Sequence, residues 1–127
     1  MTRPLVLVVD DDPDILDAIC DILETEGYEV ARARHGEEAL ERVAARRPAV
    51  ILLDLMMPVM DGVAFSQALR LRPANRDIPI VVISADGNPQ RAAAVGATGY
   101  LAKPFDIEAL LAQVAGITGA AAPPAIP

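Results

Sequence analysis

The chain has 127 residues, a length that fits one compact domain, and 53% of them are hydrophobic. Its net charge of −7 argues against direct contact with nucleic acid, because a phosphate backbone is bound by clustered Lys and Arg. No apolar run reaches the length of a membrane span, and the single cysteine, Cys20, cannot form an internal disulfide. We therefore expect a cytoplasmic domain that contacts neither nucleic acid nor membrane.

Apolar runs of strand length alternate with segments of helical periodicity, and this cycle repeats five times. The expected strands are Leu5–Val9, Tyr28–Ala33, Ala49–Leu53, Ile78–Ser84 and Gly99–Ala102. The first, third and fourth runs are continuously apolar, which is typical of strands buried on both faces of a parallel sheet.

Each strand is followed by the signature of a helix. Asp12-Pro13 predicts an N-cap with proline at the first helical position, and Gly27 is placed to end that helix. Asn88-Pro89 repeats this pattern for a fourth helix that Gly96 closes, and Asp106 is the expected cap of a fifth. Strict alternation of five strands and five helices predicts an α/β fold with a doubly wound (βα)5 parallel sheet in the order 2-1-3-4-5. Functional groups are then expected at the carboxyl ends of the strands.

The last part of the chain differs in composition from the rest. Residues 116–127 carry no charge and are mostly Ala, Pro and Gly, a composition typical of linkers and frayed ends. We therefore expect a folded domain over residues 1–115 and a flexible tail or linker over residues 116–127.

Polar residues follow four of the expected strands at their carboxyl ends. Asp10 and Asp11 follow the first strand, Asp54 the third, Ser84 ends the fourth, and Lys103 follows the fifth. Because these ends share one edge of a parallel sheet, the carboxylates, the hydroxyl and the ammonium should converge there. Clustered carboxylates repel one another unless a cation compensates, and an all-oxygen set suits Mg²⁺. This constellation could hold a phosphoryl group.

Four motifs extend the pattern, and together they resemble the receiver domains of response regulators, the CheY-like superfamily with a flavodoxin-like fold. They are Val8–Asp12, Leu53–Gly62, Ile83–Ala85 and Gly99–Phe105, in the right order and at the right strand ends. The resemblance covers roughly residues 4 to 115. One departure is the spacing from Ser84 to Lys103, which is about one helical turn short of the family pattern and implies a shortened helix 4.

The resemblance implies a role for each residue of the acidic cluster. Asp54 would be the phosphoacceptor. Asp11 and Asp54 would ligate Mg²⁺ directly with the backbone carbonyl of Met56, and Asp10 would ligate it directly or through water; Mn²⁺ could replace Mg²⁺.

The remaining family positions have roles by the same resemblance. Lys103 would contact the phosphoryl oxygens, and a cis peptide is implied at Lys103-Pro104. Ser84 would bond to the phosphoryl group and sense it, and Tyr100 would turn inward as the second half of a switch.

The function implied is that of a signalling receiver and not an enzyme, because it would catalyse only its own phosphotransfer and dephosphorylation. The phosphoryl group would come from a histidine kinase or a histidine phosphotransfer protein. Because the chain has no effector domain, its signal would pass to a downstream protein or to a missing output domain.

Two other classes of protein fit the sequence less well. A hydrolase of the haloacid-dehalogenase type would use Asp10 as nucleophile and Asp12 as acid/base, but Asp14 stands where that pattern wants Thr or Val, and the chain is too short for a cap domain. A pseudo-receiver would act only as a docking module, yet the acid pair, acceptor and lysine are all present. Asp12 is better explained as a helix cap, His35 has no expected partner, and Cys20 is expected to be a packing residue.

Overall fold

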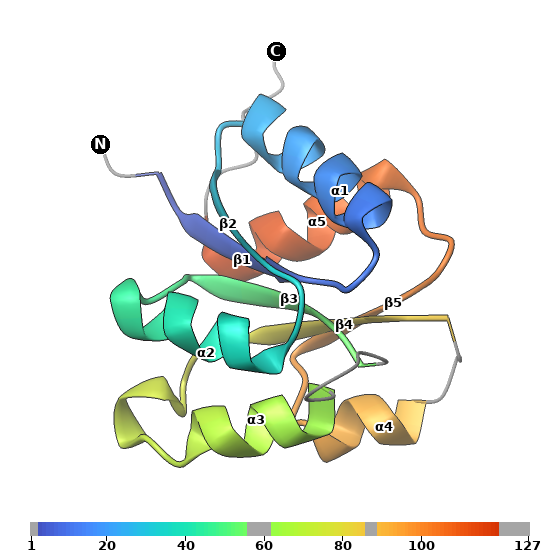
Figure 1. The fold of residues 1–127 in the computed structure, drawn as a ribbon. Coiled ribbons are helices and arrows are strands. Elements are labelled where there is room, and N and C mark those ends of the chain that lie inside the picture. Colours follow the sequence, from blue (N-terminus) through green and yellow to red (C-terminus); the bar gives the residue numbers. More distant parts are fainter. Residues whose placement is uncertain (1–2, 56–61, 86–88, 120–127) are drawn as a thin grey trace.

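The computed structural model describes residues 3–55, 62–85 and 89–119 and shows a five-stranded parallel sheet between two layers of helices (Figure 1). The strand order is β2-β1-β3-β4-β5, as predicted. The strands are β1 (Leu5–Val9), β2 (Glu29–Ala33), β3 (Val50–Asp54), β4 (Ile80–Ser84) and β5 (Gly99–Ala102).

Three strands begin later than the apolar runs suggested. Strand β3 begins at Val50 and not at Ala49, and it ends at Asp54 and not at Leu53. Tyr28 donates its backbone N–H to Leu23 O at the end of the preceding helix, so β2 begins one residue later than predicted. The Ile78 N–H is bonded to Asn75 O in a turn, and β4 begins after Pro79, which has no N–H to donate. The apolar pattern predicts which residues are buried, but it does not show that a backbone N–H is already bonded to a preceding helix or turn and so cannot join the sheet.

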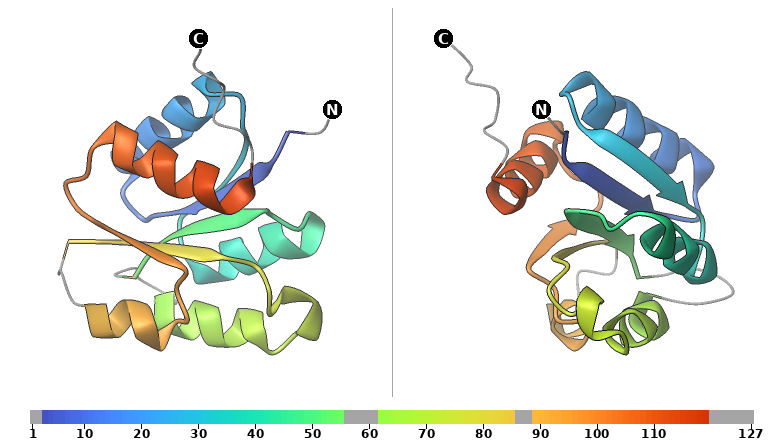
Figure 2. Two further views of the ribbon diagram at one scale, coloured as in Figure 1. Left: turned by 180° about the vertical axis from the view of Figure 1, so that it is seen from behind. Right: turned by 90° about the vertical axis from the view of Figure 1, so that its left-hand side faces the viewer.

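The helices cover both faces of the sheet (Figure 2). Aliphatic side chains at alternate positions of the central strands face two helices on one side and three on the other. The first side holds α1 (Pro13–Thr25) and α5 (Ile107–Thr118), and the second holds α2 (Gly36–Ala45), α3 (Gly62–Arg70) and α4 (Pro89–Ala94). No helix within the described ranges is long and apolar enough to cross a membrane. A 3-10 turn, η1 (Pro73–Asn75), follows α3.

Several expected helix boundaries are present. The Asp12 carboxylate caps α1 by accepting from Asp14 N and Ile15 N. Gly27 adopts a φ of 94° just after this helix, a conformation that glycine reaches without steric cost. Asp106 occupies the N-cap position of α5 but makes no side-chain capping bond.

The lengths of α4 and α5 can be compared with the expected ones. The shortened helix 4 is confirmed, because α4 has only six residues. Helix α5 runs to Thr118, so the boundary that we expected at residue 115 falls inside this helix.

The register of the strands brings their carboxyl ends to one edge of the sheet. Val9 pairs with Ala33 on one side and Leu53 on the other, and Ser84 pairs with Ala102. The residues that follow these strands therefore lie close together although they are far apart in the chain.

Candidate functional site

Three carboxylates meet at the carboxyl edge of the sheet. Asp10, Asp11 and Asp54 each offer an oxygen, and these oxygens lie within 4.8 Å of one another. Asp10 and Asp54 are buried, with exposed fractions of 1% and 5%, whereas Asp11 is exposed. The cluster thus has two buried carboxylates and one that is exposed to solvent. Its three acidic residues converge as expected from the strand ends.

Asp10 is held by bonds to three different segments. Its Oδ1 accepts from Asp12 N at 2.9 Å, and its Oδ2 accepts from Lys103 Nζ at 3.0 Å. Its own backbone N–H donates to Ala33 O at the end of β2, with an N···O distance of 3.1 Å. The Asp12 side chain is engaged in capping α1, so the interpretation of Asp12 as a cap is confirmed.

Lys103 is the only cation that the structure places against these carboxylates within the described ranges. Its Nζ lies 3.0 Å from Asp10 Oδ2 and 3.5 Å from Asp54 Oδ2. Burial alone would lower the pKa of Lys103, but the hydrogen bond to Asp10 and the charges of Asp10 and Asp54 outweigh burial, so the pKa is raised. The ammonium therefore stays charged and compensates part of the negative charge.

The donor set fits a hard divalent cation. Among the described residues, three carboxylates within 4.8 Å of one another face one ammonium, so negative charge remains in excess. Mg²⁺ prefers oxygen ligands and retains several waters, which suits a cluster with one exposed member. Asp10, Asp11 and Asp54 are the residues that would hold the ion, and Met56, the fourth expected ligand, lies outside the described residues.

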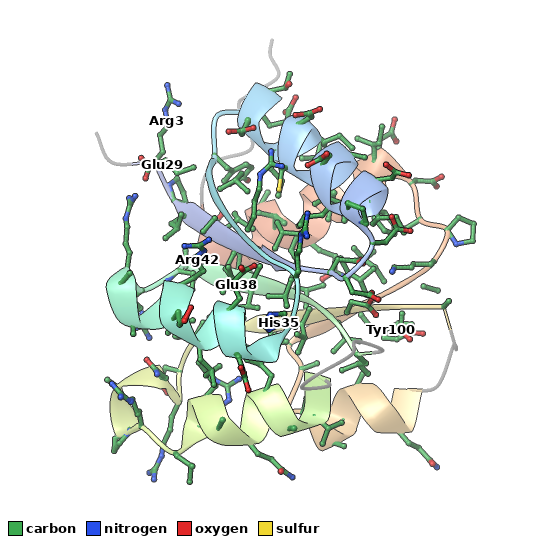
Figure 3. All side chains as sticks on the ribbon, viewed as in Figure 1. Arg3, Glu29, His35, Glu38, Arg42 and Tyr100 are labelled. Atoms are coloured by element: carbon green, nitrogen blue, oxygen red, sulfur yellow. The ribbon has the colours of Figure 1, made fainter. Side chains whose placement is uncertain are left out.

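Ser84 and Tyr100 lie on the strands next to this cluster. Ser84 is fully buried at the end of β4, and its backbone carbonyl accepts from Lys103 N at 2.9 Å. Tyr100 is half-buried on β5, where it pairs with Val82 (Figure 3). The Tyr100 hydroxyl is buried and makes no hydrogen bond with the part of the chain that the structure describes. The peptide bond between Lys103 and Pro104 is cis, as expected.

His35 has a partner that the sequence reasoning missed. Its Nδ1 caps α2 by accepting from Glu38 N at 3.3 Å, while the Glu38 carboxylate accepts from Arg34 N at 2.8 Å. Figure 3 shows His35 at the start of this helix. A glutamate three residues after a cap is the pattern of a capping box, and that signal was present in the sequence.

Comparison with known proteins agrees with this architecture. The family model described as the response regulator receiver domain matches residues 6–115. The transcriptional regulatory protein PrrA of Mycobacterium tuberculosis is 44% identical over 117 residues, which is 90% of this chain and 49% of that protein. The chain thus spans about half the length of the curated relatives that it matches.

Solved structures are similar over nearly the whole chain. The chemotaxis protein CheY4 of Vibrio cholerae has a TM-score of 0.86 and 37% identity, covering 91% of this chain and 99% of that one. The receiver domain of a sensor histidine kinase from Pseudomonas aeruginosa, solved with a magnesium ion coordinated in the active site cleft, has a TM-score of 0.86 and 28% identity, covering 94% and 100% of the two chains.

The chain belongs to the response-regulator receiver family. Members of this family are signalling modules that accept a phosphoryl group in two-component systems, and they are not enzymes in the usual sense. The hydrolase alternative is not the family that the chain matches. A hydrolase of that type would use Asp10 as its nucleophile. In this structure, however, the two carboxylate oxygens of Asp10 accept hydrogen bonds from Asp12 N and Lys103 Nζ.

Proposed function

We propose that Asp54 is the phosphoacceptor and that the reaction depends on Mg²⁺ held by Asp10, Asp11, Asp54 and the backbone carbonyl of Met56. The observation that carries this proposal is the cluster of three carboxylate oxygens within 4.8 Å at the end of β3, with Lys103 beside it. Mn²⁺ shares the preference for oxygen ligands and is the alternative ion.

The proposed transfer is a displacement at phosphorus. A carboxylate oxygen of Asp54 bonds to the phosphorus of a phosphohistidine, the phosphorus–nitrogen bond breaks, and its electron pair returns to the imidazole nitrogen. A carboxylate is a weak nucleophile, so positioning and charge compensation supply most of the rate. The bound cation would withdraw negative charge from the phosphoryl oxygens. Autodephosphorylation would be the attack of water on the same phosphorus, which returns the Asp54 carboxylate and inorganic phosphate.

Lys103 and Ser84 would recognise the transferred group. The Lys103 ammonium already lies 3.5 Å from Asp54 Oδ2, so a phosphoryl group on that oxygen would enter its reach. Ser84 is buried at the end of the adjacent strand, from which its hydroxyl would donate to a phosphoryl oxygen. Tyr100, whose buried hydroxyl makes no bond with the described residues, would then change its position and carry the signal outward.

The proposed partners follow from this chemistry. The phosphoryl donor would be a histidine kinase or a histidine phosphotransfer protein. The signal would pass to a downstream protein or to an output domain, for which the longer relatives have room. We place the domain in the cytoplasm, where the free and buried thiol of Cys20 would remain reduced. The folded receiver is proposed to act without touching nucleic acid, and the segment that follows it would serve as a flexible tail or linker.

The test is phosphorylation by acetyl phosphate with Mg²⁺, followed by intact-mass and peptide mass spectrometry. Wild type should gain one phosphoryl group, on Asp54, and should gain none when Mg²⁺ is chelated. Asp54→Asn should gain none, whereas the matched control Asp12→Asn, which alters only the cap of α1, should be labelled like wild type. Label that persists in Asp54→Asn, or that lies on Asp10, would contradict the proposal.

A further inference from the structure

A groove lies between α2 and the segment formed by the end of α3 and η1, away from the acidic site. Leu40, Val43 and Ala44 of α2 form one wall and Ala68 of α3 lies opposite. The lining is completed by Arg72, Ala74 and Asn75. Its volume is about 300 Å³. Helices α2 and α3 both end at the side of the molecule opposite the carboxyl ends of the strands (Figure 1). We call this hollow the α2–α3 groove.

Positive charge is concentrated in two segments that contribute to or follow the elements lining this groove. Segments 42–47 and 70–76 hold six of the 11 Lys and Arg residues in a chain whose net charge is −7. Three of these six arginines have structural roles. Arg42 Nε donates to Arg32 O at 3.0 Å, Arg46 pairs with Glu29, and Arg70 Nη1 donates to three backbone carbonyls, those of Asn75, Arg76 and Ile78.

The other three arginines make weaker contacts with the described residues, and the bond of Arg76 runs from its Nε to Arg70 O at 3.5 Å. Arg47, Arg72 and Arg76 are exposed, and none forms an ion pair with a carboxylate of residues 3–55, 62–85 or 89–119. Arg72 lines the groove, and Arg47, which follows α2, donates its Nε to Ala74 O of η1 at 3.4 Å. A groove with a mixed apolar and polar lining is thus bordered by Arg72 and Arg47, neither of which has an ion-pair partner among the described residues, in a protein that carries an excess of acid.

We propose that the α2–α3 groove binds an acidic, amphipathic helix of a partner protein. Apolar side chains of that helix would enter between α2 and α3, in the way that helices are bound in hydrophobic grooves. The volume is at the lower end for small-molecule pockets and suits inserted side chains better than a whole ligand. Carboxylates flanking the apolar stripe would pair with Arg47 and Arg72, whose guanidinium groups favour bidentate contact.

Two other occupants fit less well. A nucleic acid would supply phosphates for the arginines but no apolar side chains to enter the groove beside Leu40 and Val43. A second copy could present the acidic residues of α1, but the apolar face of that helix, including Leu16 and Ile19, is buried in its own core. Neither offers both carboxylates and free apolar side chains. The proposal uses no residue of the acidic site and does not depend on phosphotransfer.

The test is fluorescence anisotropy with a labelled synthetic helix of about 15 residues, with Leu at positions i, i+3, i+4 and i+7 and Glu at the flanking positions. Wild type should bind this peptide at least tenfold more tightly than a permuted peptide of the same composition. Arg47→Ala/Arg72→Ala, and separately Ala44→Glu, should weaken binding at least tenfold. Arg34→Ala removes an exposed arginine outside the groove and should bind like wild type, and circular dichroism confirms that each variant folds.

Several results would overturn the proposal. They are the absence of peptide binding at about 1 mM, equal binding of the permuted peptide, or equal binding by the double arginine variant. Tighter binding of a DNA duplex that is lost in the same double variant would assign the arginines to nucleic acid. Self-association in sedimentation experiments that the double variant abolishes would assign the groove to a second copy.

Discussion

Lys103 Nζ lies closer to Asp10 Oδ2 than to Asp54 Oδ2, at 3.0 Å against 3.5 Å. Before phosphorylation, the lysine that is proposed to bind the phosphoryl group therefore contacts Asp10 more closely than the proposed phosphoacceptor Asp54. Asp10 is almost fully buried, so this ion pair also compensates a charge that water cannot reach.

Removing the lysine should therefore destabilise the metal-free protein. We expect Lys103→Ala to lower the free energy of unfolding by about 1–3 kcal/mol, because the buried Asp10 carboxylate loses its charged partner. In the Asp10→Asn background the same change should cost much less. Urea denaturation in the presence of a chelator measures both, and effects that add within about 0.5 kcal/mol would show that the two residues are not coupled.

Mg²⁺ should stabilise the native state by relieving repulsion among Asp10, Asp11 and Asp54. We expect the melting temperature to rise with Mg²⁺ concentration. Asp11→Asn should weaken this response while leaving the metal-free protein as stable as wild type or more so. Asp14→Asn, a change on α1 outside the cluster, should keep the full Mg²⁺ response. An Asp11→Asn protein that binds Mg²⁺ normally and is less stable without it would contradict this account.

The buried thiol of Cys20 should make stability depend on alkaline pH. Burial raises the pKa of Cys20 from 9.0 to about 11. Because the pKa is raised in the folded state, the stabilisation is complete below about pH 9 and is lost as pH rises toward 11. Between these pH values wild type should lose roughly 2–3 kcal/mol more of its unfolding free energy than Cys20→Ala does. Lysine and tyrosine titrate in both proteins, so parallel pH profiles would show that the thiol is not responsible.

Ser84 should be required for the conformational response to phosphorylation. A ligand shifts a two-state equilibrium only by the difference between its affinities for the two states. Reversing a 1:99 ratio takes about 5.5 kcal/mol, so the loss of one side chain that binds the phosphoryl group should weaken the response strongly. With beryllofluoride as the phosphoryl mimic, Ser84→Ala should show much smaller backbone amide shifts around Tyr100 than wild type. The control is Ser66→Ala, because Ser66 Oγ donates to Val63 O within α3. Equal shifts in Ser84→Ala and wild type would remove Ser84 from the mechanism.

Helix α4 should exchange its amide hydrogens faster than the other helices. It has six residues, and Ala92 and Val95 are the apolar side chains that anchor this segment to the core. A helix this short gains little from its own hydrogen bonds. Hydrogen exchange of the unphosphorylated protein should show lower protection over residues 89 to 95 than over α5, and equal protection would contradict the expectation.

Much of the fold could be predicted because β1, β3 and β4 are buried on both faces and read as continuous apolar runs. The site followed from the same logic, since Asp54, Ser84 and Lys103 each lie at or directly after the end of a strand. The η1 turn was not predicted, because Pro73 and Asn75 give a general turn signal and not a specific one.

Contacts between distant side chains were harder to foresee. The preference of Lys103 for Asp10 joins residues 93 positions apart and depends on geometry that a strand pattern cannot supply. The role of His35 was missed for a different reason. Histidine is not among the preferred capping residues, so the glutamate at position 38 was the better guide.

The ion pair at the acidic site also has a spectroscopic consequence, because Lys103 is the only lysine in this chain and the other ten cations are arginines. A protein grown with lysine that is isotope-labelled at Nζ alone would therefore give a single side-chain nitrogen signal, and that signal would come from the ammonium beside Asp10 and Asp54. The chemical shift of this one nitrogen should therefore respond to metal binding and to phosphorylation.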